Sequence, residues 1–223
     1  MSASLTSWEV VLPERGAQGL ARRRPRALVR MSSATGGDEE LSVPVAVGRR
    51  LSAAQRSGEA APGSRAELVY LVGQLSRSCG RARVEDLVGR RDYAEQELAQ
   101  KLAQDGYASV TVEALVDRAR ECGLVDDARF AGAFVRSKVL AGWGPTKISR
   151  ELELRGISVD ELEGWPDEFF SEADERSCAL GLARRRRLTG KNDYQKLVRF
   201  LCGRGFALGM SCDVAREVLD DAR

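Results

Sequence analysis

The spacing of apolar positions divides the chain near residue 64. From Arg65 onward apolar residues recur every three or four positions, which is the period of an amphipathic helix. Leu68, Val72 and Leu75 lie on one such stripe, and the spacing predicts a helix that ends near Gly80. A second, short helix is predicted around Val84–Val88.

Residues 1–63 show no lasting period and are rich in Gly, Ser, Ala, Pro and Arg. They carry nine arginines against six carboxylates, a net charge of +3, with a basic tract at Arg22–Arg26. We predict a disordered basic extension. The tract is interpreted either as a solvated tail or as an arm for nucleic acid or a partner protein.

One short pattern occurs three times in the remaining chain. Two apolar residues four positions apart are followed by glycine four positions later and then by a large apolar residue. The three copies are Leu98, Leu102, Gly106, Tyr107; Ile148, Leu152, Gly156, Ile157; and Leu197, Leu201, Gly205, Phe206. The pattern is typical of a helix that ends in a left-handed glycine cap, with the next side chain folded back onto the last turn.

The three glycines lie 50 and 49 residues apart, a repeat period typical of stacked helical units. Each copy is flanked by stretches with helical spacing, and Ser158 with Glu161 forms a capping box that predicts a further helix. We therefore predict an all-α fold of three tandem three-helix units. The predicted domains are residues 64–125 (an N-terminal helix plus the first unit), 126–173 and 174–223.

Two adjacent carboxylates, Asp126 and Asp127, precede the apolar face that begins at Phe130. An acidic residue at this place accepts hydrogen bonds from free backbone N–H groups and favours the positive end of the helix. We interpret the pair as a helix start, because the sequence shows no partner residues for a metal site or for acid–base catalysis.

The composition excludes several classes of function. The chain has no histidine, and its five cysteines form no Cys-x-x-Cys motif, so neither a zinc site nor a redox motif is indicated. No nucleophile–base pair or phosphate loop is visible, so we expect neither an enzyme nor a cofactor. No run of 18 apolar residues and no signal-peptide pattern occur, and we expect a cytoplasmic protein with reduced thiols and no membrane contact.

Three segments carry a family resemblance. They are GRRDYAEQELAQKLAQDGY (89–107), GLVDDARFAGAFVRSKVLAGWGPTKISRELELRGI (123–157) and KLVRFLCGRGF (196–206). In this order and spacing the chain resembles the RecX family, the regulatory proteins of the RecA recombinase. The sequence departs from the family pattern at Ala94 and Ala207, where the family usually has serine, which places local helix boundaries in question.

The resemblance implies an elongated, curved array of helical units that binds the groove of the RecA filament on single-stranded DNA. It implies a negative regulator that inhibits the ATPase, strand-exchange and coprotease activities of RecA, within DNA repair, recombination and the SOS response. Direct DNA contact would be secondary. We expect a monomer, because each unit would bury its own core.

The candidate partner-binding residues are basic. Between Arg176 and Arg204 there are nine bases and one acid, whereas Asp92–Asp127 holds nine acids and three bases. The candidates are Arg184, Arg185, Arg186, Arg187, Lys191 and Arg204 in the third unit and Lys147, Arg150 and Arg155 in the second. Arg184–Arg187 are expected on one helix. Arginine pairs with both phosphate and carboxylate, so a filament contact and a solvated surface both fit these residues.

Two smaller questions stay open at this point. Lys147 could form an ordinary surface pair with Glu151, four positions away. Trp143, between two glycines, could pack against a neighbouring unit or serve as an exposed anchor, and packing is the preferred interpretation. The main alternative function is a direct DNA-binding protein of helix-turn-helix type, against which stands the net charge of −1 for residues 64–223.

Overall fold

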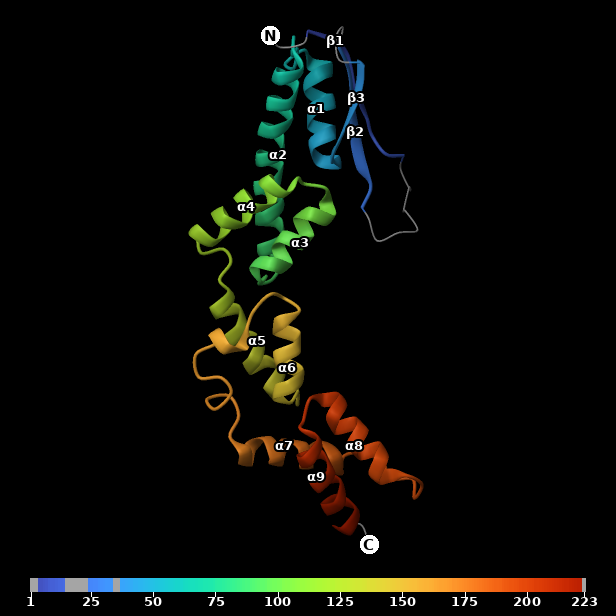
Figure 1. Cartoon of the computed structure of the whole chain (residues 1–223), viewed down its shortest axis with the longest axis vertical. Coiled ribbons are helices and arrows are strands. Elements are labelled where there is room, and N and C mark those ends of the chain that lie inside the picture. The colour runs from blue at the N-terminus through green and yellow to red at the C-terminus, as the bar shows by residue number, and fades with distance from the viewer. Residues whose placement is uncertain (1–3, 15–23, 34–36, 222–223) are drawn as a thin grey trace. The chain divides into compact units, whose positions relative to one another are not determined.

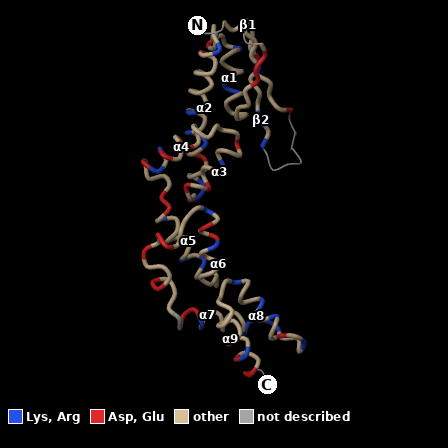
Figure 2. Tube along the Cα trace, in the orientation of Figure 1, with Lys and Arg blue, Asp and Glu red and all other residues tan. Residues whose placement is uncertain are grey.

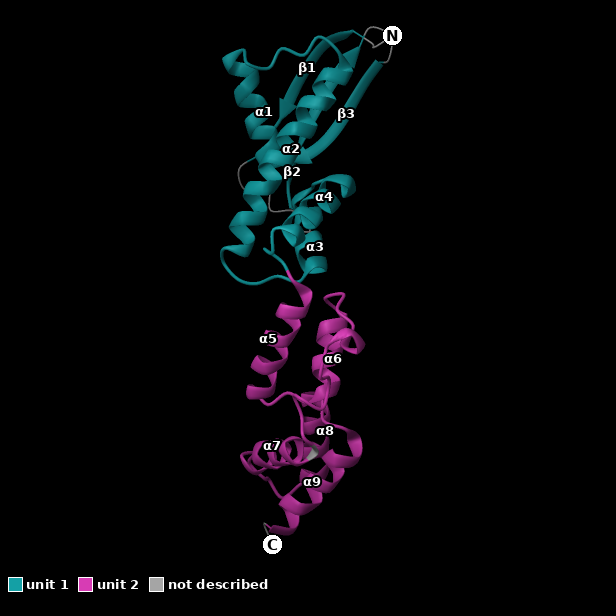
Figure 3. Cartoon of the chain, turned by 90° about the vertical axis from the view of Figure 1, so that its left-hand side faces the viewer, with its two compact units in different colours: residues 1–125 teal, residues 126–223 magenta. Residues whose placement is uncertain are grey.

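The computed structural model describes residues 4–14, 24–33 and 37–221, which form two compact units, 1–125 and 126–223 (Figure 3). The described residues are mainly helical, with one small sheet near the N-terminus (Figure 1). None of their helices is long and apolar enough to cross a membrane.

Unit 1 begins with a three-stranded antiparallel sheet in the order β1–β2–β3. The strands are β1 (Leu5–Val11), β2 (Arg26–Ser33) and β3 (Gly37–Pro44). In the register, Val29 of β2 pairs with Val10 and Leu41 of the two neighbours. Alternate residues of β2 are buried on one face, as strand geometry requires, and Arg30 lies on the other face.

Helix α1 (Val45–Ser57) covers the apolar face of the sheet (Figure 1). It buries Val47 and Leu51, and it approaches β2 closely at Gly48. A Cβ atom at Gly48 would lie 2.4 Å from the Cβ of Ala27, so glycine is required for this contact.

The prediction of a disordered extension over residues 1–63 is therefore wrong for the part of it that the structure describes. Strands β1–β3 and α1 form an ordered layer whose apolar residues join those of α2 in one core. The alternation of buried residues in β2 is short, and the strands and helices that cover it lie elsewhere in the sequence. Local spacing therefore gave only a weak indication of a strand. Arg22 and Arg23 of the basic tract lie outside the described residues.

Helix α2 (Arg65–Val88) is one continuous helix, and the expected break near Gly80 does not occur. Gly80 instead allows a close helix contact, because a Cβ atom there would lie 2.4 Å from the Cδ1 of Leu115. Helices α3 (Glu95–Asp105) and α4 (Ser109–Glu121) pack beside α2 (Figure 1). Leu98, Leu102 and Leu115 belong to the same core as the sheet.

Unit 2 contains α5 (Asp127–Leu140), α6 (Pro145–Glu153) and the 3-10 helix η1 (Val159–Glu161). Asp126 caps α5 by accepting a 2.9 Å hydrogen bond from the N–H of Arg129, which confirms the predicted helix start. The further helix expected after Ser158 is only η1. Ser158 does accept a bond from the N–H of Asp160, but the turn ends at Leu162 in extended backbone.

The C-terminal part of unit 2 is a bundle of α7 (Glu172–Arg184), α8 (Asp193–Arg204) and α9 (Leu208–Asp221). Its core includes Ala179, Leu197, Leu201, Phe206 and Val214. Because α7 ends at Arg184, the expected single helix carrying Arg184–Arg187 is not observed. Arg185 is the residue that ends α7, and Arg186 and Arg187 lie in the turn that follows.

The three predicted glycine caps are present. Gly106, Gly156 and Gly205 have φ values of 99°, 80° and 95°, in the left-handed region. In each copy the next residue donates its N–H to the carbonyl five positions earlier, which is the Schellman pattern. The repeated sequence pattern therefore corresponds to a repeated local structure.

Candidate functional site

Eight of the described cations of unit 1 pair with carboxylates, and seven form no ion pair with a described carboxylate. Asp105 accepts hydrogen bonds from Arg24 at 2.5 Å and from Arg83 at 2.7 Å. Arg91 forms an ion pair with Glu97 at 2.6 Å. Further ion pairs involve Arg30, Arg65, Arg90, Arg118 and Arg120. Acidic and basic positions both occur on α2, α3 and α4 (Figure 2).

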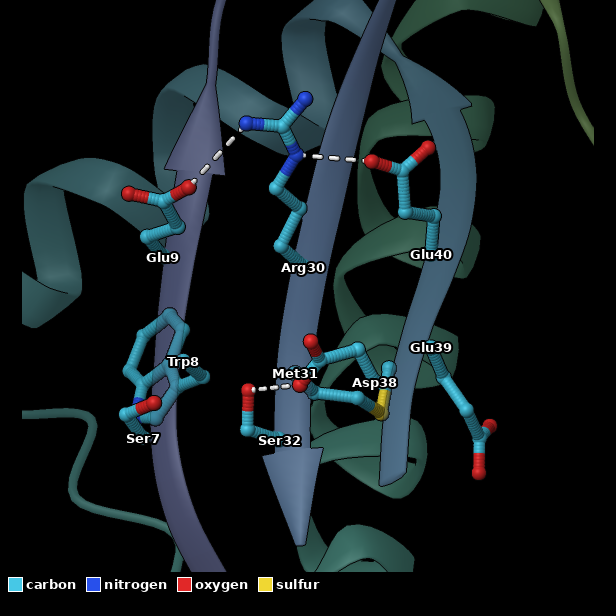
Figure 4. A pocket seen from close by; sticks show the side chains of 9 residues that line it. All are labelled: Ser7, Trp8, Glu9, Arg30, Met31, Ser32, Asp38, Glu39 and Glu40. Carbon is cyan, nitrogen blue, oxygen red and sulfur yellow. Dashed lines mark hydrogen bonds and ion pairs between the residues drawn. The ribbon is translucent and has the colours of Figure 1, made fainter. Parts of the chain in front are cut away.

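The open face of the sheet is a hollow of about 520 Å³ with an acidic lining. Arg30 lies between Glu9 and Glu40, at 3.4 and 2.7 Å, and Ser32 donates to Asp38 (Figure 4). The hydrogen bond to Glu40 is the main cause that raises the pKa of Arg30. With its one arginine already paired, this face does not suit an anionic ligand.

In unit 2 the described cations without an ion pair outnumber those that form one. Several of its cations form no ion pair with any carboxylate in the described ranges. They include Lys138, Lys147, Arg150, Arg185, Arg186, Arg187, Lys191 and Arg204. Basic positions gather along α8 and the turn before it (Figure 2). Such cations remain available to an external anion.

Two groups of cations in unit 2 lie over aromatic rings. We call the first the Trp143 cluster, made of Phe130, Phe134, Lys138, Trp143, Lys147 and Arg155. The second is the Phe200 cluster, made of Arg186, Phe200 and Arg204. A cation over an aromatic face is attracted by the ring quadrupole, so the ring holds the charge in place without neutralising it.

In the Trp143 cluster, two lysines approach the indole ring. The Nζ atoms of Lys147 and Lys138 lie 4.1 and 4.9 Å from the ring centroid of Trp143. Phe134 meets Trp143 edge-on at 6.4 Å and stacks on Phe130 at 5.9 Å. The guanidinium carbon of Arg155 lies 5.1 Å from the Phe134 centroid.

The local fold explains how this cluster is assembled. Phe130, Phe134 and Lys138 are spaced by four residues and therefore share one face of α5. After α5, Gly142 takes a left-handed φ of 73°, and Trp143 donates its N–H to the carbonyl of Lys138 at 3.0 Å. This Schellman cap folds the indole back onto the last turns of the helix.

Arg155 and Lys147 differ in their partners. Arg155 donates to both the side chain and the backbone carbonyl of Glu151, with 2.8 Å to the carboxylate, so its charge is shared. The possible pair of Lys147 with Glu151 is not formed, because Glu151 contacts Arg155 and Lys147 lies over Trp143. Trp143 is half-buried, which agrees with packing on Phe134 while part of the ring remains accessible.

In the Phe200 cluster, the guanidinium carbons of Arg186 and Arg204 lie 4.7 and 5.5 Å from the ring centroid of Phe200. Arg204 follows Phe200 by four residues on α8, and Arg186 comes from the turn after α7. Arg204 also donates to the backbone carbonyl of Ala141 at 3.1 Å.

The remaining predicted residues lie outside both clusters. Arg184 is paired with Asp221 at 2.7 Å, so it is a weaker candidate than its neighbours. Arg185, Arg187, Arg150 and Lys191 are exposed. Lys191 is held in a tight loop in which Asp193 accepts bonds from Thr189 and Gly190. Desolvation raises the pKa of Asp193, but these hydrogen bonds, together with the charge of Lys196, lower it below its ordinary value.

Lys138, Phe134 and Phe200 are not among the functional residues expected from the sequence. An apolar helix face was expected to begin at Phe130, and the structure leaves both Phe130 and Phe134 half-buried at the surface. The usable signal was the four-residue spacing of an aromatic residue and a cation, which occurs at Phe134–Lys138 and Phe200–Arg204. Chemically, the two clusters can bind an anionic surface. In the described ranges no group of three or more Cys, Asp or Glu side chains is placed to hold a metal ion.

Comparison with known proteins adds a family relationship. Residues 81–118 match the model of the first three-helix domain of RecX, and residues 126–163 match that of the second. The regulatory protein RecX of Halorhodospira halophila is 36% identical over 126 residues, which cover 54% of this chain and 76% of that protein. Those of Chromohalobacter salexigens and Vibrio vulnificus are 38% and 35% identical and are each covered to 80%.

Two solved structures resemble the fold. A crystal structure of regulatory protein RecX aligns with a TM-score of 0.55 at 16% identity and covers 98% of this chain and 99% of that one. RecX from Lactobacillus salivarius aligns with a TM-score of 0.52 at 17% identity, covering 64% of this chain and 96% of that one. At these identities the likeness concerns the fold alone.

Proposed function

The chain belongs to the RecX family, and from this premise we propose that it regulates RecA by binding the filament that RecA forms on single-stranded DNA. In this proposal binding hinders the conformational cycling of adjacent RecA protomers. ATP hydrolysis, strand exchange and coprotease activity then fall together. The protein acts by binding and needs no catalytic group or cofactor of its own.

The observation that carries the choice of binding surface is the set of cations in unit 2 without carboxylate partners. Four of these, Lys138, Lys147, Arg186 and Arg204, are held over aromatic rings, and Arg155, which also pairs with Glu151, lies over Phe134. Holding a long side chain in place beforehand reduces the entropy lost when it meets an anion. We propose that the Trp143 and Phe200 clusters contact the filament, with Arg185, Arg187, Lys191 and Arg150 as peripheral contacts.

A charge-neutralising double variant, Lys147→Gln with Arg186→Gln, tests this surface. We expect the concentration that half-inhibits RecA ATP hydrolysis to rise about tenfold, since a tenfold change corresponds to about 1.4 kcal/mol. The matched control is Arg216→Gln in the same unit, where the arginine is exposed and already paired with Asp213 at 2.9 Å. Equal inhibition by the double variant and the control, both folded, would rule out these clusters.

A second candidate is direct binding to single-stranded DNA, which the aromatic rings among the cations favour. Binding of an oligonucleotide in the absence of RecA distinguishes the two. We expect weak binding that falls steeply between low and physiological salt. Tight binding to naked DNA without inhibition of RecA would favour the second candidate.

A further inference from the structure

Helix α6 lacks a cap of its own. Its N-cap is Gly144, which has no side chain to accept a hydrogen bond, and its first residue is Pro145. The first N–H groups of a helix need partners from outside the helix. Here Gly144 donates to the carbonyl of Arg204 at 2.8 Å, and Thr146 donates to the carbonyl of Gly205 at 3.2 Å.

These acceptors belong to the C-terminal end of α8. The Schellman cap of α8 uses the N–H groups of Gly205 and Phe206, which bond to Cys202 and Leu201. The carbonyls of Arg204 and Gly205 take no part in this cap, and they accept the hydrogen bonds from the start of α6. The positive end of one helix therefore meets the negative end of another, an arrangement that the helix dipoles favour.

The contact is too close for any side chain at its centre. A Cβ atom on Gly144 would lie 2.4 Å from the carbonyl oxygen of Gly205. One on Gly205 would lie 2.4 Å from the Cβ and 2.5 Å from the N of Lys147. We call this contact the Gly144–Gly205 joint. It also includes the bond from Arg204 to Ala141.

The joint lies between the two cation–aromatic clusters. Lys147 of the Trp143 cluster contacts one side of Gly205, and Arg204 of the Phe200 cluster precedes it in the chain. We propose that Gly144 and Gly205 are positioning residues, which fix the two clusters as one two-part binding surface. This rests on the function proposed above. When two binding groups are held together, the second binds at a high effective concentration.

The joint itself can be tested without RecA. The N–H of Thr146 is the second amide of α6, and Val110 offers the matched amide of α4, whose N-cap Ala108 provides no side-chain bond either. By amide hydrogen exchange of the full chain, we expect Thr146 to exchange at least about tenfold more slowly than Val110, after correction for intrinsic rates. Equal protection of the two amides would show that the hydrogen bond from Thr146 to Gly205 is not formed, and would contradict the joint.

Gly144→Ala tests the positioning role. The backbone at Gly144, with φ −83° and ψ 166°, is open to alanine, so the variant disturbs the contact with the backbone of Gly205 and Phe206. The control is Gly203→Ala on α8, where a Cβ atom meets nothing within 4 Å. We expect Gly144→Ala, but not the control, to speed exchange at Thr146 and to weaken inhibition of RecA about tenfold, as loss of effective concentration implies.

A coupling measurement separates positioning from simple destabilisation. In the natural chain Arg186→Gln is expected to weaken inhibition several-fold, and in the Gly144→Ala chain less than about twofold, because the Phe200 cluster no longer adds to the Trp143 cluster. If Arg186→Gln weakens inhibition by the same factor in the natural chain and in the Gly144→Ala chain, the proposal is overturned. If the natural chain does not inhibit RecA, the proposed function fails, while the Thr146 exchange result still stands.

Gly205→Ala provides a second variant at the other side of the joint. Gly190→Ala is its control, since both glycines have positive φ, 95° and 77°, but only Gly205 has a close neighbour. We expect faster exchange at Thr146 and weaker inhibition for Gly205→Ala alone. Equal results for these two variants would attribute the effect to backbone strain and contradict the joint.

Discussion

Asp105 joins three parts of unit 1 through one carboxylate. It ends α3 and accepts hydrogen bonds from Arg24, which precedes β2, and from Arg83 of α2. Its side chain is only 11% exposed, so water replaces these bonds poorly. The carboxylate therefore connects the sheet, α2 and α3 in a way that no local sequence pattern indicates.

We expect Asp105→Asn to lower the free energy of unfolding of unit 1 by about 1–2 kcal/mol, because two charge-assisted hydrogen bonds weaken and Arg24 is half exposed. Urea unfolding measures the change. Asp213→Asn is the comparison, since its pair with Arg216 is exposed on both sides, and it should change stability by less than about 0.5 kcal/mol. Similar losses for both variants would contradict the role given to Asp105.

The stability of the folded chain is expected to depend on alkaline pH through Tyr107. Burial, with smaller contributions from Cys79 and Asp105, raises its pKa from 10.0 to about 12. Above pH 10 the unfolded chain releases the phenol proton while the folded chain keeps it, so stability is lost as pH rises from about 10 to 12.

The Tyr107→Phe variant has no such proton and isolates the effect. Between about pH 10 and 12 the natural chain should lose up to about 1.4 kcal/mol per pH unit more than the variant. Urea unfolding at a series of pH values measures this difference. Parallel pH curves for the two proteins would show that Tyr107 does not titrate in this range.

At the scale of elements, alanine is expected to change stability in opposite directions at two glycines of α2. Gly80→Ala should destabilise unit 1 by about 1–3 kcal/mol, because the added methyl group would overlap Leu115. Gly73→Ala in the same helix meets only the end of Arg77 at 3.8 Å and should stabilise by about 0.5–1 kcal/mol through helix propensity. Urea unfolding should show opposite signs, and equal signs would contradict the close contact at Gly80.

The same elements show what could be predicted from the sequence. The caps at Gly106, Gly156 and Gly205 were predictable because a Schellman motif depends on residues close together in the chain. The role of Gly80 was not, because its neighbour Leu115 is distant in sequence. The sheet was missed for the same reason, since the strand pattern around Val29 is short and its burial depends on α1 and α2.

The candidate site was partly predictable. The basic segment Arg176–Arg204 is visible in the composition, and Arg186 and Arg204 were predicted on that ground, whereas Lys147 and Arg155 were predicted as basic residues of the second unit. Which cations are neutralised is a question of tertiary contacts. Arg184 meets Asp221 on α9, whereas Arg186 meets Phe200, and the sequence does not distinguish the two.

At the scale of the whole molecule, the N-terminal layer is expected to be required for unit 1. Val29, Val47 and Leu68 are all buried in one core, so deletion of residues 1–63 would expose the apolar side of α2. Such a deletion should lower the thermal midpoint of unit 1 and leave unit 2 folded. Hydrogen exchange resolved by residue measures both, and an unchanged protection of α2 and α3 would contradict this expectation.

The most direct measurement of the central claim is ATP hydrolysis by RecA on single-stranded DNA, titrated with this protein. Binding to naked DNA at two salt concentrations accompanies it. We predict inhibition below one protein per RecA protomer, together with weak DNA binding that salt abolishes. No inhibition at a molar excess over RecA would contradict the assignment of this chain as a regulator of the filament.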